Sequence, residues 1–395
     1  MGAKGNLKTN FFMDLFERRE IPNVYKKLSY LNEEHFLNEA DEKAFNTSFN
    51  YNIYTIALIP EYLKTELKNK EKYAEKTYFQ NNLGYAIRIK DILSIDGYLK
   101  TQFKSNNKVI KRSLTRLESC FNISYKTFYG TITKKDYSFL MDSLREMLIL
   151  RFIQRNDQNQ KLKEWDLIVN KTFDQINNRE ASLFVIYDNN RPIDISLNYH
   201  YHKIIFSAIS SYDIDYHKFG VGHVEMIKLI EWCIKDQFEI LELGYGDLEF
   251  KKRWCNYIYN FKYQVIYTRN SLLVTLLAKL ELSKLSIKEY LKARKLNLLY
   301  QKVREKLSFK KLKKSNEKAH LAYEKIPITE PERFEGLVKV NLEDKKYMFL
   351  RHIIYEFLYS TREHKDNTSI FKIFETPNSY LIRGKNNAQQ ITLKN

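Results

Sequence analysis

The chain of 395 residues is 44% hydrophobic and 14% aromatic, which excludes a disordered protein and predicts two or three packed domains. Three widely spaced cysteines, an odd number, argue against a zinc site and a disulfide framework, so we expect no metal and a reducing compartment. The net charge of +18 suits polyanions such as nucleic acid, acidic lipid surfaces or anionic substrates, although a lysine-rich genome bias explains the same balance.

The N-terminus has no apolar core of signal-peptide length. The longest apolar run, 271–280, is about half as long as a membrane span requires. We therefore expect a cytoplasmic protein, bacterial by composition and at most peripheral at the inner membrane surface.

The first half of the chain alternates between helical and strand patterns. Strands are predicted at NYNIYTIALI (50–59), YAIRIKDILSI (85–95) and ISYKTFYGTI (123–132). Helices are predicted at 13–20, 24–31, 33–45, in the polar segment 61–84, in the basic segment 96–120, and at 134–155.

The second half begins with the clearest alternation in the sequence, two strand patterns joined by the turn Asn-Asn-Arg-Pro. The predicted order is strand–strand–strand–helix–strand–helix–strand, over 181–188, 193–202, 203–213, 222–236, 238–246, 247–254 and 263–269. A basic helical stretch follows from 271 to about 318. The tail, 326–395, holds one predicted helix (348–360) and two short strands, and we interpret it as a small appended module.

Gly220 and Gly222 stand between a strand and an amphipathic helix. The first amides of a helix lack intrahelical acceptors, and the helix dipole favours an anion there. Glycine also lets the backbone approach a phosphate closely. The pair alone is compatible with an ordinary turn, since the nucleotide motifs G-x-x-x-x-G-K-[ST] and G-x-G-x-x-G are absent or incomplete. Its position between the two strands favours a pyrophosphate loop.

Residues 217–222, HKFGVG, resemble the Q/R-x-x-G-x-G/A motif of the GNAT acyltransferase superfamily, with His217 in place of Gln or Arg. The segment GYGDLEFKKRW (244–254) resembles the signature of the CelD-like branch, which is related to the FemAB aminoacyltransferases; its matching residues are Gly246, Asp247, Phe250 and Lys251. VIKRSLTRLE (109–118) is similar to the segment that links the two halves in that branch. The resemblance is clearest over 180–270.

The resemblance implies an α/β GNAT fold with two GNAT-like lobes. A divergent lobe would span 1–165 and a catalytic lobe 166–275, followed by a basic helical segment (276–325) and the module 326–395. It also implies acetyl-CoA, or another acyl-CoA, as co-substrate. The pantetheine arm and pyrophosphate would be held by backbone groups of Ile209, Ser210, Ser211, Lys218, Phe219, Gly220, Val221, Gly222 and His223.

Acyl transfer requires a base for the acceptor and an acid for the leaving thiolate. Asp213, at a strand end, and His200 or His202 are candidate bases, with Asp213 equally suited to a turn or cap. Strand alternation would place both histidines on one face. Tyr245 is a candidate acid, and Lys251 a candidate cation near the thioester; a core position and a solvated helix face are the respective alternatives.

Acceptors in this branch are often saccharides, lipid-linked precursors or peptides. Two other functions fit the composition. One is a FemAB-type transferase that takes its acyl group from aminoacyl-tRNA, for which the positive charge is suitable. The other is a non-catalytic protein that binds polyanions or membrane surfaces. Residues 279–318 carry 14 Lys/Arg and four Glu, so they either rest on an anionic membrane or polymer or form a helical hairpin with an exposed lysine face.

Overall fold

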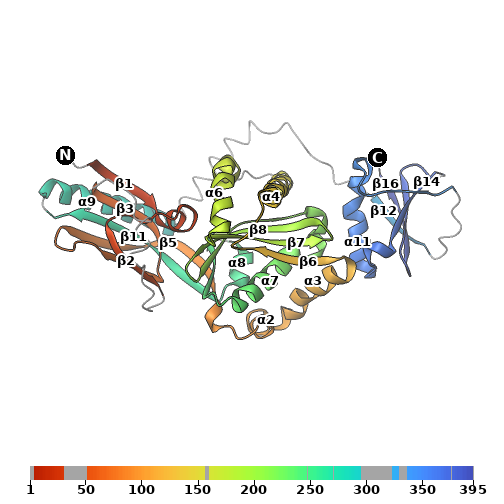
Figure 1. Cartoon of the computed structure of the whole chain (residues 1–395), viewed down its shortest axis with the longest axis horizontal. Helices are drawn as coiled ribbons and strands as arrows, with labels where there is room; N and C mark the ends of the chain where they lie inside the picture. The colour runs from red at the N-terminus through yellow and green to blue at the C-terminus, as the bar shows by residue number, and fades with distance from the viewer. Residues whose placement is uncertain are drawn as a thin grey trace. The chain divides into compact units, whose positions relative to one another are not determined.

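The computed structural model describes residues 4–30, 51–155, 160–246, 248–269, 271–294, 323–328, 336–374 and 376–394. The chain forms two compact units, each assembled from segments that are far apart in sequence. Figure 1 labels helices and strands of the chain. Unit 1 consists of Met1–Arg88, Tyr201–Phe206 and Ile240–Ser315. Unit 2 consists of Ile89–His200, Ser207–Glu239 and Asn316–Asn395. The lobe boundaries expected from the sequence stay a prediction.

Unit 1 is built on a sheet in the order β1-β3-β11-β5-β10, continued by the first residues of β9. β11 runs antiparallel to both β3 and β5. β9 pairs in parallel with β10 only at 204–206 and 240–242. The strands are β1 (Lys4–Asn10), β3 (Tyr51–Pro60), β5 (Tyr73–Arg88), β9 (Ile204–Tyr212), β10 (Ile240–Tyr245) and β11 (Tyr257–Thr268).

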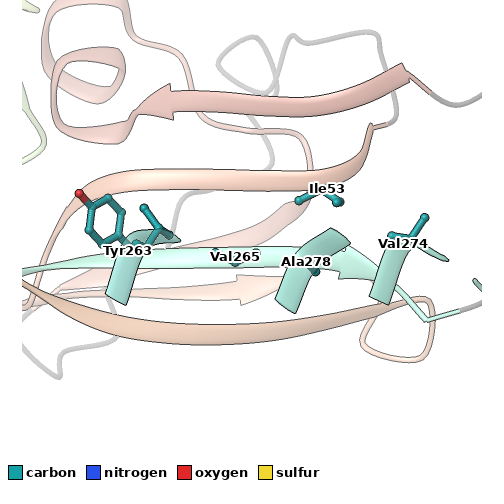
Figure 2. Close-up of a cluster of buried hydrophobic side chains, with 6 residues drawn as sticks. Ile53, Tyr263, Val265, Val274 and Ala278 are labelled. Carbon is teal, nitrogen blue, oxygen red and sulfur yellow. The ribbon is translucent and has the colours of Figure 1, made fainter. Parts of the chain in front are cut away.

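Helix α9 (Leu272–Ala293) covers this sheet by packing on β3, β5 and β11. Figure 2 shows Val274 and Ala278 of the helix beside Ile53, Val265 and Tyr263 of the strands. The other elements of unit 1 are α1 (Phe11–Met13), a π-helical turn (Asp14–Arg18), the ribbon of β2 (Tyr25–Tyr30) and β4 (Leu63–Leu67), and α8 (Glu249–Trp254). Among the helices described, none is long and apolar enough to cross a membrane.

Unit 2 has a sheet in the order β9-β8-β7-β6, to which β9 contributes residues 207–212. The β7–β8 hairpin turns at Asn189 and Asn190, and β6 pairs antiparallel with β7. The elements are α2 (Ile95–Phe103), α3 (Asn107–Cys120), β6 (Ile123–Phe128), α4 (Lys134–Arg155), α5 (Gln160–Lys163), α6 (Trp165–Asn177), β7 (Ala181–Asp188), β8 (Arg191–Tyr201) and α7 (Val221–Lys235).

The C-terminal module belongs to unit 2 and contains a sheet ordered β12-β16-β15-β14-β13 with the helix α11. Its elements are β12 (Tyr323–Ile328), β13 (Val338–Lys339), α11 (Arg351–Thr361), β14 (Ser369–Ile373), β15 (Ser379–Arg383) and β16 (Ala388–Leu393). Helix α11 packs against α3 and against the 3-10 helix Ile214–Phe219 (η5). The module therefore docks on the rest of unit 2.

Most elements from 96 onward agree with the sequence prediction; the helix 134–155 and the strand 181–188 are confirmed to the residue. Two helical predictions are wrong. Residues 24–31 hold β2, and 61–84 hold β4 and most of β5. Pairing of β5 along β11 overrides the lysine-rich, helix-like composition of this segment. The predicted helix 33–45 and residues 295–318 of the basic stretch lie outside the described residues.

Candidate functional site

The segment that follows β9 is built by two local devices. Asp213 caps η5, and its Oδ1 accepts a hydrogen bond from the Asp215 amide at 3.0 Å. Gly220 then ends η5 and opens α7 with φ +63°, a left-handed conformation that favours glycine. A Cβ at Gly220 would lie 2.7 Å from Ser113 Oγ on α3. Glycine is thus required here by the backbone and by the approach of α3.

The first turn of α7 leaves two amides open. The N–H groups of His223 and Val224 donate to the Gly220 carbonyl oxygen, at 2.8 and 3.4 Å. The amides of Val221 and Gly222 have no hydrogen-bond acceptor among the described residues. Because the dipole of the 15-residue helix adds positive potential at this end, the two open amides suit an anion such as a phosphate.

Strand β9 forms the edge of the unit 2 sheet next to this loop. Within the described part of unit 2, its residues 207–212 adjoin β8 on one side and no strand on the other. Ile209 and Ser211 are buried, and Ser210 Oγ donates to Glu225 Oε2 on α7 at 2.7 Å. The free edge of β9 offers backbone groups to an extended, amide-containing ligand, as the sequence resemblance implies.

Asp194 on β8 and Glu225 on α7 form a buried acidic pair. Burial raises the pKa of both carboxyls; Glu225 raises that of Asp194 further, and Arg151 opposes both shifts. Neither carboxyl oxygen of Asp194 has a hydrogen-bond partner in the described structure. The two carboxyl groups interact electrostatically between β8 and α7. The alternation of the sequence did not predict this contact.

Helix α11 of the C-terminal module holds the outer side of η5. Tyr216 on η5 donates a hydrogen bond to Asp188 at 2.9 Å, and its hydroxyl lies 3.2 Å from that of Tyr355. The Phe219 ring packs against Tyr359 at 5.3 Å and against Phe121 at 5.0 Å. Aromatic packing of this kind fixes the loop backbone without using its amides.

Glu356 of α11 pairs with Lys218, a residue predicted to meet the pyrophosphate. Its Oε1 lies 3.4 Å from Lys218 Nζ, while Oε2 accepts from Lys325 at 2.8 Å and from Tyr323 at 2.7 Å. Burial acts against ionisation of Glu356, but the hydrogen bonds of Lys325 and Tyr323 and the two lysine charges prevail and lower its pKa to about 2. The Lys218 ammonium is thus already partly neutralised within unit 2.

These contacts of Glu356, mainly those with Lys325 and Tyr323, make the stability of the folded protein dependent on pH. Because the folded-state pKa of Glu356 lies below its ordinary value of 4.5, the stabilisation is complete above pH 4.5 and is lost as the pH falls through about 2. We expect Glu356→Gln to lower Tm at pH 7 and to have little effect near pH 2. Thermal unfolding followed across this range measures the difference. Glu324→Gln, at an exposed pair with Lys394, is the control expected to change little at either pH.

In unit 1, β10 carries a buried carboxylate with three donors. Glu242 accepts hydrogen bonds from the Gly244 amide at 2.7 Å, from the Tyr259 hydroxyl at 2.7 Å and from the Tyr62 hydroxyl at 3.0 Å. Burial raises its pKa to about 7, although the three hydrogen bonds and the Lys251 charge act in the opposite direction. A carboxyl group that titrates near neutral pH and accepts hydrogen bonds from two hydroxyl groups can accept and return a proton.

Lys251 on α8 is brought back toward β10 by the turn Gly244–Gly246. Both glycines have positive φ, +73° and +105°. Lys251 Nζ donates to the Tyr245 carbonyl oxygen at 2.8 Å, and burial lowers the pKa of Lys251 while Glu242 opposes the shift. Lys251 is therefore held by the turn rather than on a solvated helix face. Asp247, in the same turn, lies outside the described residues.

Three other predicted catalytic residues have different surroundings. Tyr245 ends β10, is 36% exposed and packs edge-on against Phe12 at 6.2 Å. Asp213 Oδ2 accepts a hydrogen bond from Arg191 at 2.5 Å, so this carboxylate is both an ion-pair partner and a cap. His202 lies in the turn after β8 with φ +51° and is exposed.

The predicted common face of His200 and His202 is wrong, because β8 ends at Tyr201. His200 is a buried residue that hydrogen-bonds Ser182 Oγ at 2.8 Å and stacks on Tyr129 at 4.8 Å. The chain turns sharply after β8, so alternation does not extend to His202.

The predicted site residues are divided between the two units. Unit 1 holds His202, Tyr245 and Lys251. Unit 2 holds Asp213 and the whole predicted cofactor set, Ile209–Ser211 and Lys218–His223. Sequence reasoning missed Glu242 with its two tyrosines; the signal was present as a glutamate inside the apolar strand pattern FEILELGYG. Over the residues described, no cluster of three or more His, Cys, Asp or Glu side chains is placed to hold a metal ion.

Residues 108–252 match the protein family described as Acetyltransferase (GNAT) domain. This range contains α3, the β7–β8 hairpin, the Gly220 loop, α7 and β10. Together with the mixed α/β architecture, the match confirms the predicted fold class and defines a GNAT-type acyltransferase domain. The CelD-like branch remains a proposal.

No curated protein matches the sequence as a relative. Among solved structures, the chain is similar to a conserved protein of unknown function from Bacteroides thetaiotaomicron (10% identity, 58% of this chain and 72% of that one, TM-score 0.36). It is also similar to the C-terminal domain of a putative lysylphosphatidylglycerol synthetase from Agrobacterium fabrum (10%, 60% and 72%, 0.36) and to FemX (11%, 60% and 77%, 0.31). At these TM-scores the likeness supports no conclusion about activity.

Proposed function

We propose that the protein transfers an acyl group, in the first instance acetyl from acetyl-CoA, to an amine or hydroxyl. The observation that supports this most is the pair of open amides at Val221 and Gly222 at the start of α7, the helix that follows β9 and η5, together with the free edge of β9. This combination lies inside the residues matched to the GNAT domain. A saccharide, a lipid-linked precursor or a peptide of the cell envelope is the proposed acceptor.

These residues suit a cofactor in which an amide-containing arm joins a thioester to a pyrophosphate. In the proposal, the amides of Val221 and Gly222 bind the pyrophosphate, and the β9 backbone at 209–211 pairs with the arm. Bound acyl-CoA supplies an activated carbonyl that the acceptor nitrogen or oxygen attacks. Lys218 contributes its positive charge to pyrophosphate binding only when its ion pair with Glu356 is broken.

The acid–base group in this proposal is Glu242. Its pKa of about 7 means that a substantial fraction is ionised at neutral pH, as a general base requires. The Tyr62 and Tyr259 hydroxyls, each hydrogen-bonded to Oε2, provide a path for the proton. Lys251, with its lowered pKa, is the proposed second proton-transfer group. Tyr245 remains the proposed acid for the leaving thiolate.

Gly222→Asp tests the cofactor site without removing the fold. A carboxylate in the first turn of α7 interacts favourably with the helix dipole, so we expect Tm to be kept. The same charge repels a pyrophosphate, and binding of CoA should weaken about 10- to 100-fold. Titration calorimetry with CoA and acetyl-CoA measures the loss, and Gly222→Ala is the matched control. Equal CoA binding by the aspartate variant would rule out this loop as the pyrophosphate site.

The donor itself is tested by competition. If acetyl-CoA is the donor, a panel of CoA esters added to the native protein should give a retained adduct in mass spectrometry that tRNA does not displace. Displacement by tRNA, with transfer from aminoacyl-tRNA, would assign the reaction to aminoacyl transfer instead. The net charge of +18 makes this second outcome chemically reasonable.

A further inference from the structure

Helix α9 presents two faces of opposite character. Its inner face packs on the sheet of unit 1, where Figure 2 shows Val274 and Ala278. The buried residues of the helix are Val274, Ala278, Glu281, Leu285 and Glu289. The outer face is rich in exposed apolar side chains, with Leu272 93% and Leu273 66% exposed. The exposed apolar residues of the helix are Leu272, Leu273, Leu276, Leu277, Leu280, Ile287, Tyr290 and Leu291.

These residues lie on one side of the helix, in a stripe that is interrupted between Leu280 and Ile287 by exposed Ser283 and Lys284. At about 100° per residue, the exposed leucines fall within less than half of the helix circumference, nearly opposite the buried face. Exposed Lys279 and Lys284 lie on the two borders of the stripe. A helix with an apolar outer stripe bordered by lysines is typical of a helix lying in the plane of a membrane surface, where the lysine stems reach the headgroups.

The charges of α9 are sorted between the two faces. Both acidic residues of the helix point inward: Glu281 pairs with Lys8 at 2.5 Å, and Glu289 accepts from the Asn81 amide at 2.6 Å. The exposed charges of the helix are therefore all cationic. An apolar stripe with only positive charge beside it is complementary to anionic lipid rather than to a neutral bilayer.

We infer that α9 docks the protein on anionic membrane surfaces, with its leucine stripe inserted between headgroups and its lysines on the lipid phosphates. This interaction is separate from acyl transfer and would place the protein at the membrane whatever its acceptor is. It uses the outer face of α9 and leaves the packing of unit 1 unchanged.

Vesicle sedimentation with the full-length protein tests the inference. Vesicles of phosphatidylcholine alone are compared with an equimolar mixture of phosphatidylcholine and phosphatidylglycerol. We expect binding to the anionic vesicles, and a partition coefficient about a hundredfold lower for the triple variant Leu273→Gln/Leu276→Gln/Leu280→Gln. Lys279→Gln and Lys284→Gln should each weaken binding about fivefold at low salt and less at high salt. Leu167→Gln, an exposed leucine on α6, is the matched control.

A second measurement keeps the test independent of the triple variant's folding. Leu276→Trp should show a blue-shifted emission when anionic vesicles are added, after subtraction of the native tryptophans, whereas Leu167→Trp should not. Equal binding to both vesicle types, or no emission shift, would overturn the inference. So would light scattering that shows a dimer converted to a monomer by the leucine variant, because the stripe would then be an interface between two copies of the chain.

Discussion

Replacing Glu242 by glutamine is expected to lower kcat for acyl transfer by about a hundredfold or more, the usual contribution of a positioned general base. The wild-type rate should rise with pH through about 7, because the base acts only when it is ionised. The variant should lose this dependence. A pH–rate profile with a synthetic amine acceptor measures both effects.

Stability gives an independent readout for the same residue. The folded-state pKa of Glu242 is about 7 and the ordinary value is 4.5, so the folded protein holds this proton more tightly. The contribution of Glu242 to the free energy of unfolding is therefore complete below pH 4.5. It declines by about 3 kcal/mol in total as the pH rises to about 7. Glu242→Gln should abolish the decline, while Glu289→Gln, at a buried glutamate of α9, should keep both the decline and the activity. A variant with normal kcat would exclude Glu242 as the base.

Gly84→Ala is expected to destabilise the protein by about 3 kcal/mol and to disturb the proton path at the same time. Gly84 lies on β5 directly under Tyr259, and a Cβ there would lie 2.2 Å from Tyr259 Cζ. The ring is fully buried, so it has to move or the strands must separate. Either change breaks the hydrogen bond from Tyr259 to Glu242.

A double-mutant cycle isolates this contact. With Tyr259→Leu already present, the added Cβ of Gly84→Ala has more room, so the two losses of unfolding free energy should be clearly less than additive. Denaturant unfolding provides the four values. Gly97→Ala is the control, because the nearest atom to its Cβ would be Ser94 Oγ at 3.2 Å, the end of a small side chain. Additive losses would show that Gly84 matters for a reason other than the ring.

The local sequence pattern predicted those helices, strands and turns whose structure is determined by residues close in sequence. The β7–β8 hairpin followed from alternation and Asn-Asn-Arg-Pro, and α4 from its helical periodicity. The position of the Gly220 loop between β9 and α7 followed from the same signals. The reason for glycine at 220 did not, because Ser113 comes from α3, about a hundred positions earlier.

The features that sequence reasoning missed all depend on contacts between distant segments. β5 is a strand because β11 pairs along it, although its composition favours a helix. Glu242 acquires its raised pKa from burial, which outweighs the opposing hydrogen bond from Tyr62, a residue 180 positions away. Two residues that the sequence predicted as candidate bases have structural partners that the sequence did not predict. Asp213 accepts a hydrogen bond from Arg191, and His200 is hydrogen-bonded to Ser182.

The docking of α11 on η5 has a consequence for the order of biosynthesis. Tyr216 finds its partner Tyr355 139 positions later in the chain. At a synthesis rate of about 5–20 residues per second, roughly 7 to 28 seconds pass between the synthesis of Tyr216 and that of Tyr355. During that interval Phe219 and Phe121 lack the cover of Tyr359 and Tyr355. The nascent chain therefore leaves these two rings uncovered until α11 has been made, and a chaperone would have these rings to protect during that period.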